Sequence, residues 1–350
     1  MREENAEPRG DFAAPPQMSS RHVRAVSARG QLVGDDVDHG REATRPGDIP
    51  APGWRDVVGR VRRRIADDDL SIVAAGVAFY ALIATFPGLL ALLSIYGLIL
   101  DPGQWAQQLD FLRGQLEPEA NSLLISLLLG LGESDRTRMG AGVVGGVVVT
   151  LWGASLGVRA LMRALNVAYG EREKRSVVHR HGLALLLTMG AISVASTIGL
   201  VLLSVPLLSR SLEASALLQR LVFYARWPVV ALIFWLSLLV FYRYGPSRAL
   251  ARWSWVSWGA LLATATWLAG TGILAWYVAG SRHYHQAYGS VGIVVLVLAW
   301  FLLSAFAVLL GAEVNAELER QTRQDTTVGD DKPAGARGAR VADTLGDASS

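Results

Sequence analysis

Two arginines interrupt a long apolar stretch of this chain. They are Arg159 and Arg163 in the sequence WGASLGVRALMRALNVAYG, residues 152–170. An arginine in the centre of a membrane helix costs about 2.5 to 3.5 kcal/mol on the insertion scale, so it needs a carboxylate, a lipid phosphate or water. Arg163 and Asn166 lie near the end of the stretch, where long polar side chains reach the membrane interface. Arg159 lies about one turn deeper, which makes it the stronger candidate for a binding role.

Small residues occupy another face of the same predicted helix. At 100° per residue they fall on one stripe, separate from the arginines. A stripe of small residues lets two helix backbones approach closely in a membrane. The arginines would then face the bundle interior or the membrane interface. The stripe consists of Gly153, Gly157, Ala160, Ala164 and Ala168.

A carboxylate that could neutralise these arginines lies near the end of the last apolar stretch. The sequence LLGAEVNAELER contains Glu313 and Asn315. We predict that Arg159 or Arg163 pairs with Glu313, and the alternative is that Glu313 faces cytoplasmic water. The candidate polar site, within the membrane or at lipid headgroups, comprises Arg159, Arg163, Asn166, Glu313 and Asn315.

The first apolar stretch contains Pro87 followed by Gly88. Proline lacks an amide donor and clashes with the preceding helical turn, so we predict a kink or a break at this point. In transporters, the free backbone ends of a broken helix bind ions or substrate. A kink that serves only packing is the alternative.

A short loop concentrates Arg243, Arg248 and Arg252. Such a basic patch binds lipid phosphate, or it reflects the ordinary enrichment of arginine in cytoplasmic loops. In another loop, His283 and His285 are spaced like zinc ligands, but no carboxylate or cysteine lies nearby in the sequence. An aromatic belt at the membrane interface is therefore favoured over a metal site.

Catalytic motifs are absent from the sequence. It contains no phosphate-binding P-loop, no zinc-protease helix and no G-x-S-x-G turn. The chain has 0 Cys, which excludes disulfides and thiolate metal sites. We therefore predict no enzyme activity, no catalytic residue, no metal and no cofactor.

The elements that carry these residues are membrane helices. The 350 residues are 51% hydrophobic, and the charges collect between long uncharged stretches. Because stray backbone amides have no partner in hydrocarbon, each stretch must be a helix. The predicted fold is all-α and polytopic, with six transmembrane helices. Their approximate bounds are 70–100, 140–166, 182–209, 227–242, 253–281 and 286–312.

The remaining segments complete the predicted organisation. Residues 1–50 and 320–350 are mixed polar sequences, predicted to be disordered cytoplasmic tails. Residues 51–69 form a basic juxtamembrane segment, and residues 70–319 form the membrane domain. Between the first two spans, Leu and Trp residues at helical spacing predict amphipathic helices on the outer leaflet. Arginine and lysine are denser beside one set of helix ends, which places both termini in the cytoplasm.

Four stretches together resemble the YihY/BrkB family of bacterial inner-membrane proteins over about residues 69–319. They are AAGVAFYALIATFPGLLALLSIYGLI, LWGASLGVRALMRALNVAYGEREKR, YRYGPSRALARWSWVSWGALLATATWLAGTGILAWYV and YHQAYGSVGIVVLVLAWFLLSAFAVLLGAEVNAELE. The resemblance implies a six-span, multi-pass protein of the inner membrane, connected with envelope biogenesis, serum resistance and the transport of lipid or solute. The family was once labelled a ribonuclease, and nothing in this sequence supports that chemistry.

The leading functional expectation is a transporter or lipid-handling factor in envelope biogenesis, without covalent chemistry. Its expected partners are membrane lipids, above all anionic ones, and not nucleic acid. A homo-oligomer remains open. The first alternative is a scaffold whose polar groups only join helices, and a more remote one is an intramembrane hydrolase.

Overall fold

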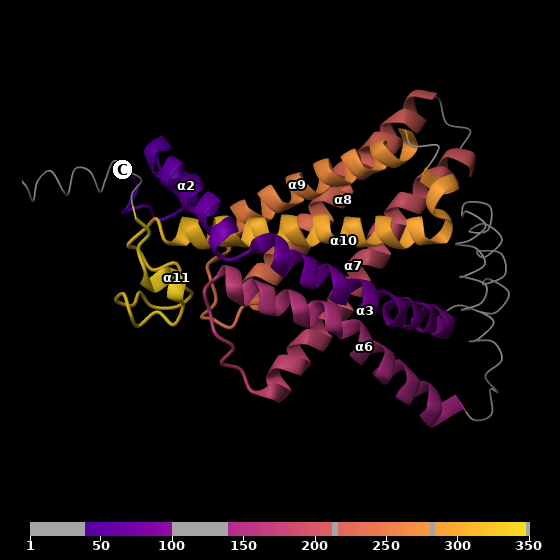
Figure 1. Ribbon diagram of the computed structural model, residues 1–350, viewed down its shortest axis with the longest axis horizontal. Coiled ribbons are helices and arrows are strands. Elements are labelled where there is room, and N and C mark those ends of the chain that lie inside the picture. Colours follow the sequence, from indigo (N-terminus) through magenta and orange to yellow (C-terminus); the bar gives the residue numbers. More distant parts are fainter. Residues whose placement is uncertain (1–38, 100–138, 212–215, 281–283, 348–350) are drawn as a thin grey trace, which may run out of the picture.

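The computed structural model describes residues 39–99, 139–211, 216–280 and 284–347. In these ranges the regular secondary structure is helical, apart from one isolated β-bridge between Ala251 and Thr327. The predicted all-α class is confirmed for the described residues. The main helices are α2 (Ala51–Asp67), α3 (Leu70–Ile99), α6 (Met139–Ala168), α7 (Val177–Ser211), α8 (Ala216–Tyr244), α9 (Trp253–Gly280) and α10 (Tyr284–Glu319); η1 (Pro46–Asp48) and α11 (Arg340–Asp343) are short (Figure 1).

Four helices in the described part of the chain are long and apolar enough to cross a membrane. They are Val177–Leu202, Phe223–Tyr244, Trp253–Gly280 and Val294–Glu319. A fifth candidate is the pair Ala51–Asp67 and Leu70–Thr85, which is bent by 63° at its junction. The protein therefore has four or five candidate spans, and six spans remain a prediction. The predicted amphipathic helices before residue 139 lie outside the described residues.

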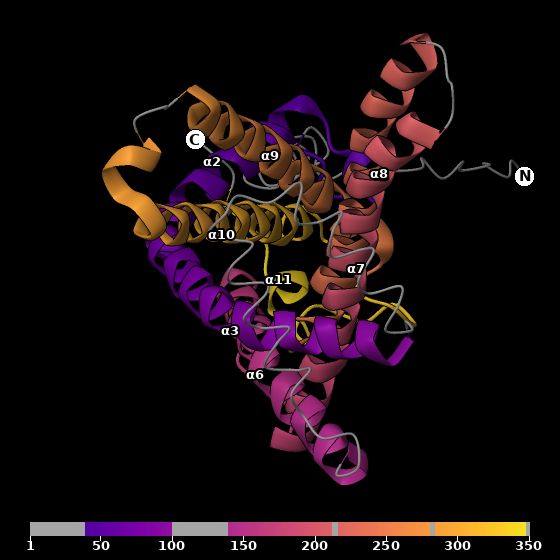
Figure 2. The same ribbon diagram turned by 90° about the vertical axis from the view of Figure 1, so that its right-hand side faces the viewer.

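Helix α10 lies at the centre of the helical bundle. It packs against α9, α3, α2 and α6, while α6 also packs against α3 and α7 (Figures 1 and 2). The largest buried cluster joins α3, α6, α8, α9 and α10 through residues such as Leu70, Leu165, Tyr242, Val256 and Leu309. Many apolar side chains on the outer faces of the helices are exposed, which suits contact with lipid chains.

Helix α3 continues through Pro87 and Gly88 without interruption. No break is therefore present in α3, whereas the predicted kink stays a prediction. The contacts at Pro87 support a role in packing. A Cβ atom on Gly153 of α6 would lie 3.1 Å from the Pro87 ring, so the proline packs where α3 and α6 cross. The bend lies instead between α2 and α3, where Asp69 has φ of 45°. A positive φ interrupts a right-handed helix, and the Asp69 carbonyl then accepts the amides of Ile72 and Val73 to begin α3.

The segment 320–347, predicted to be disordered, is ordered in the structure. Its backbone pairs with the loop before α9, since the Ala249 N–H donates to the Gly338 carbonyl at 3.0 Å. Arg337 is 7% exposed and donates to four carbonyls of the same segment. Order here rests on bonds between polar side chains and backbone, which leave no periodic apolar signal in a sequence.

Residues 39–50, at the other end of the chain, join this ordered segment. Arg41 donates to the carbonyls of Arg320, Gln321 and Gly346. Gln321 in turn donates to the His39 carbonyl at 2.7 Å. We call residues 39–50 and 320–347 the terminal cap, and the end of the molecule that carries it the cap end. The tail residues 1–38 and 348–350 lie outside the described residues.

Candidate functional site

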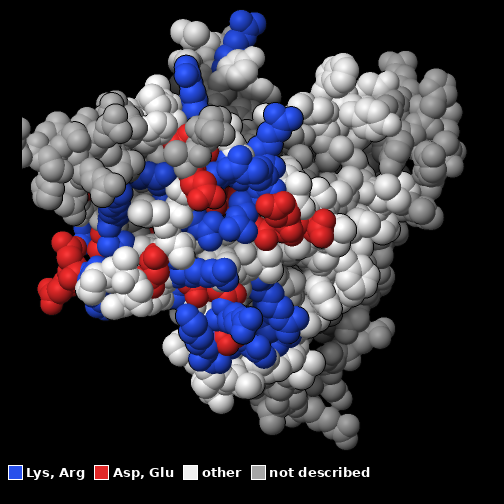
Figure 3. Space-filling model, turned by 60° about the vertical axis from the view of Figure 1, so that its left-hand side comes forward, with Lys and Arg blue, Asp and Glu red and all other residues white. Residues whose placement is uncertain are grey.

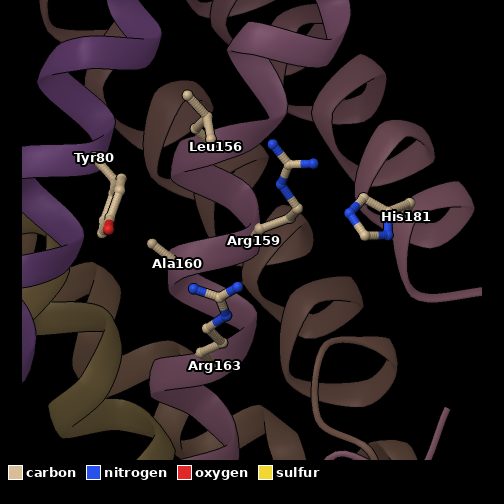
Figure 4. A pocket seen from close by; sticks show the side chains of 6 residues that line it. All are labelled: Tyr80, Leu156, Arg159, Ala160, Arg163 and His181. Carbon is tan, nitrogen blue, oxygen red and sulfur yellow. The ribbon is translucent and has the colours of Figure 1, made fainter. Parts of the chain in front are cut away.

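A pocket of about 170 Å³ lies between α3, α6 and α7. Tyr80 comes from α3 and His181 from the beginning of α7, while α6 supplies the remaining side chains (Figure 4). The lining residues are Tyr80, Leu156, Arg159, Ala160, Arg163 and His181. Both arginines that the sequence singled out therefore share one pocket.

Small residues on α6 set the direction of these arginines. A Cβ atom on Gly157 would lie 3.2 Å from the Ala81 backbone of α3, so the two helices are in close contact there. Ala164 and Ala168 are 4% and 6% exposed. Because this face packs inward, as predicted, the face with Arg159 and Arg163 is left beside the pocket (Figure 4).

Aromatic rings hold the deeper arginine in place. The Arg159 guanidinium lies over the Trp152 ring at 4.9 Å. The His181 ring is stacked on the same Trp152 ring, with centroids 4.9 Å apart and an angle of 4° between the planes. His181 Nδ1 is 2.8 Å from the Val177 carbonyl oxygen, so its other ring nitrogen is the one turned toward the pocket (Figure 4). The polar groups of the pocket are thus oriented in advance.

Neither pocket arginine is paired with a carboxylate of the described chain. The ion pairs within 4.0 Å that are formed by described residues involve neither Arg159 nor Arg163. The predicted pairing with Glu313 is wrong. Both oxygens of Glu313 are buried, and they have no hydrogen-bond partner among the described residues. The charged neighbours of Glu313 are instead Asp68 and Arg64, near the bend between α2 and α3. Glu317 and Arg320, which follow Glu313 along the chain, are also close.

The two predicted asparagines join backbone segments instead of lining the pocket. Asn166 accepts the Ser247 N–H at 2.7 Å and donates to Glu173 at 3.2 Å. Asn315 accepts the Gly259 N–H at 2.8 Å and donates to the Val256 carbonyl at 3.2 Å. Of the five predicted site residues, only Arg159 and Arg163 lie together.

The predicted basic patch is used for internal contacts. Arg248 donates to both oxygens of Glu319 at 2.8 Å, and these side chains are 1% and 0% exposed. Burial alone would lower the pKa of Arg248, but the charge of Glu319 outweighs it and holds that pKa above its usual value. Arg243 donates to the Ala251 carbonyl at 2.7 Å, and Arg252 to the Thr327 carbonyl at 3.0 Å. These bonds attach the loop to α10 and the terminal cap.

The loop between α6 and α7 is attached to the end of α8, and this contact was not expected from the sequence. Glu173 accepts three hydrogen bonds from Arg175, which also donates to the carbonyls of Tyr244 and Gly245. Burial raises the pKa of Glu173, but the hydrogen bonds and charge of Arg175 outweigh it and lower the pKa to about 2. The close spacing of opposite charges in GEREKR was the available signal.

Basic residues gather on the cap end of the molecule. In Figure 3, the left-hand side of Figure 1 is turned toward the viewer. Lys and Arg side chains are concentrated on this face. Arg55, Arg62 and Arg63 of α2 are exposed there. A surface of this kind suits the anionic lipid headgroups of a cytoplasmic leaflet.

The chemistry available in this arrangement is anion binding. Two arginines and an imidazole converge on a small volume beside exposed apolar side chains. Within the described ranges, no group of three or more His, Cys, Asp or Glu side chains could hold a metal ion. His283 lies outside those ranges.

The helices and the pocket define a polytopic membrane protein with a cationic pocket. The family model described as Virulence factor BrkB matches residues 61–336, and the chain belongs to this family. The resemblance seen in the sequence is thereby confirmed.

Curated relatives are similar over most of this chain. "Putative ribonuclease-like protein YfkH" of Bacillus subtilis (strain 168) is 28% identical over 259 residues, which are 71% of this chain and 90% of that protein. "UPF0761 membrane protein Mpe_A1422" of Methylibium petroleiphilum is 28% identical over 280 residues, 75% of this chain and 62% of that protein. "UPF0761 membrane protein NTHI0384" of Haemophilus influenzae is 21% identical over 259 residues, which are 73% of this chain and 93% of that protein. No solved structure matches significantly. Two of these three names describe a membrane protein, and the ribonuclease-like name belongs to the third relative.

Proposed function

We propose that this protein is a six-span protein of the bacterial inner membrane that transports or handles lipid during envelope biogenesis, with both termini in the cytoplasm and no covalent chemistry. The observation that carries the proposal is the pair Arg159 and Arg163, which share a pocket without a carboxylate partner among the described residues. Membership in a family of membrane proteins and four or five candidate spans support the location.

An arginine away from water is stable only where another group compensates its charge. Removing its charge from water without compensation costs several kcal/mol. The protein pairs the buried Arg248 charge with Glu319 at 2.8 Å. Arg159 receives only the Trp152 ring and a contact of 3.5 Å to the Trp152 carbonyl. A ligand phosphate would complete the missing interaction, because guanidinium and phosphate form paired, charge-assisted hydrogen bonds.

A structural scaffold is the second candidate, and the polar joints favour it. Asn315 between α9 and α10, and Asn166 beside the loop at Ser247, show that polar side chains do join segments here. The pocket arginines differ from these joints, since among the described residues no hydrogen bond or ion pair links either of them to another helix. If Arg159 and Arg163 served only to anchor α6 at the interface, any headgroup would satisfy them equally.

The test is mass spectrometry of lipids that remain bound after mild purification. Wild-type protein is compared with Arg159→Ala and Arg163→Ala. Arg220→Ala is the matched control, because Arg220 is an exposed arginine near the beginning of α8, outside both the pocket and the basic surface of α2. We expect one anionic lipid class to be enriched in wild type and control, and to be depleted in both pocket variants. Equal retention of bulk lipid by all four proteins would contradict lipid handling and support the scaffold.

A further inference from the structure

We propose that the pocket between α3, α6 and α7 binds a compact phosphate headgroup with two negative charges, carried by a lipid whose apolar chains lie along α3 and α6. This inference rests on the proposed function and names the class of lipid. It combines four observations: the charge of the pocket, its size, its preformed geometry and the surface beside it.

The pocket carries more than one positive charge. Arg159 and Arg163 are four residues apart on α6, so their side chains lie on one face and their like charges repel. Arg180 of α7 adds a further positive charge close to Arg159. A headgroup with one negative charge would neutralise only part of this set. A phosphomonoester or diphosphate supplies two charges and enough oxygens for both guanidinium groups.

The size of the pocket limits what enters it. Pockets for small organic ligands measure roughly 300 to 1,000 Å³. At about 170 Å³, this pocket is smaller than such sites, and it is large enough for a phosphate or diphosphate group. The remainder of a larger ligand must lie outside the pocket.

The geometry of the pocket is fixed before a ligand arrives. Trp152 contacts both Arg159 and His181, and the His181 ring is held by its bond to the Val177 carbonyl. In Figure 4, the Arg159 guanidinium lies above that of Arg163, and one ring nitrogen of His181 is turned toward Arg159. Binding therefore requires little side-chain ordering, which favours affinity.

An apolar strip continues from the pocket toward the membrane centre. On α6, Val149, Trp152 and Leu156 share the face of Arg159, at spacings of three and four residues. Val149 and Trp152 are 72% and 48% exposed. On α3, Tyr80 and Ile83 are 40% and 41% exposed. A cationic pocket at one end of an exposed apolar strip matches a lipid in charge and in polarity, whereas a free phosphate would use only the pocket.

The experiment measures lipid affinity for wild-type protein in neutral detergent by native mass spectrometry. Three lipids with identical dioleoyl chains are titrated: phosphatidic acid, phosphatidylglycerol and phosphatidylcholine. Inorganic phosphate is the fourth probe. We expect phosphatidic acid to bind about tenfold more tightly than phosphatidylglycerol, a difference of about 1.4 kcal/mol, since its second charge allows one further charge-assisted hydrogen bond. Phosphatidylcholine and inorganic phosphate should bind more weakly still.

Variants then assign the preference to the pocket. Arg159→Gln and Arg163→Gln should each reduce the affinity for phosphatidic acid about tenfold and abolish the preference over phosphatidylglycerol. Arg220→Gln, at an exposed arginine of α8 outside the pocket, should change neither. Because the headgroup comparison uses wild-type protein, it remains decisive if a variant fails to fold.

The outcomes separate this inference from the proposed function. If no lipid binds wild type above background, lipid handling itself fails. If lipids bind but phosphatidic acid and phosphatidylglycerol bind equally, or the glutamine variants keep the preference, the dianionic headgroup is overturned while lipid handling stands. If inorganic phosphate binds as tightly as phosphatidic acid, the ligand is a soluble phosphate and the lipid is overturned.

Discussion

At the scale of single residues, the partners of a polar side chain distinguish structural groups from candidate binding groups. Arg248 and Asn315 each have short, well-directed partners on another segment of the chain. Arg159 and Arg163 instead face a pocket. All four are polar residues in or beside apolar sequence, so residue type alone does not separate them.

The ion pair between Arg248 and Glu319 should be essential for stability. Glu319→Gln leaves the buried Arg248 charge without its counter-charge, which costs about 3 to 5 kcal/mol. We expect a fall of several degrees in the thermal unfolding midpoint in detergent. Replacing both residues by Met should recover part of the loss, since no charge is then buried. Arg252→Gln is the control, because its pair with Asp331 is exposed and contributes less than about 1 kcal/mol. Equal effects of Glu319→Gln and Arg252→Gln would contradict the prediction.

The junction between α6 and α7 should weaken in acid. The pKa of Glu173 is about 2 in the folded protein and 4.5 ordinarily. A carboxyl group with a lowered pKa stabilises the fold above pH 4.5 and loses this contribution as the pH falls from 4.5 toward 2. Glu173→Gln should therefore lower the thermal midpoint at pH 7, and the difference from wild type should shrink at pH 3. Glu42→Gln removes an exposed carboxylate and should have little effect at either pH. If the thermal midpoints of wild type and Glu173→Gln differ by the same amount at pH 7 and pH 3, titration of Glu173 does not cause the loss of stability in acid.

The sequence predicted the pocket arginines but not their surroundings. Their cost in hydrocarbon is a property of residue type, and it identified Arg159 and Arg163. Tyr80 and His181 come from other helices, so helical spacing on α6 gives no access to them. Glu313 was assigned to the arginines by depth in the membrane alone. Depth leaves open the position around the bundle, and Glu313 lies toward Asp68 and Arg64.

At the scale of elements, close helix crossings depend on residues that lack a side chain. Gly259 of α9 and Gly311 of α10 face each other, and a Cβ atom on either would overlap the other's carbonyl oxygen. Asn315 bonds across the same crossing. In a membrane, such contacts replace the hydrophobic driving force that lipid does not supply.

Gly259→Ala should destabilise this crossing, because the added methyl group forces α9 and α10 apart. Overpacking of this kind costs about 1 to 3 kcal/mol. We expect a lower thermal midpoint and less monodisperse protein by size-exclusion chromatography. Gly272→Ala on the same helix is the control, since its Cβ atom would meet nothing within 4 Å. The prediction fails if the two alanine variants are equally stable.

Sequence patterns predicted elements well where apolar composition alone decides. The spans predicted at 182–209 and 253–281 correspond to α7 and α9, because long uncharged stretches must be helical in hydrocarbon. The break predicted at Pro87 is absent, since neighbouring packing can keep a membrane helix continuous through a proline. The terminal cap was missed because its order comes from individual hydrogen bonds, such as those of Arg337 and Arg41, without periodicity.

At the scale of the whole molecule, the two ends of the bundle differ. The cap end carries the ordered terminal segments and the exposed arginines of α2 (Figures 1 and 3). Both described ends of the chain, near residues 39 and 347, lie in the terminal cap. A chain that begins and finishes on one side of a membrane must cross it an even number of times. With α2 and α3 counted as one span, the five candidate helices give an odd number, and the six spans that we propose include α6.

Cysteine labelling tests this topology directly, because the chain has 0 Cys and each introduced thiol is the only one. Arg45→Cys, Ser176→Cys and Asp330→Cys place thiols at exposed positions of the cap end, and Leu217→Cys places one at the beginning of α8, beyond its candidate span. A membrane-impermeant maleimide should label only Leu217→Cys in spheroplasts, and all four variants after permeabilisation. A permeant maleimide, which should label every variant in intact spheroplasts, is the control. Labelling of Arg45→Cys and Ser176→Cys on opposite sides would mean that α3 and α6 together cross only once, and would refute six spans. Labelling of Asp330→Cys from outside would refute a cytoplasmic terminal cap.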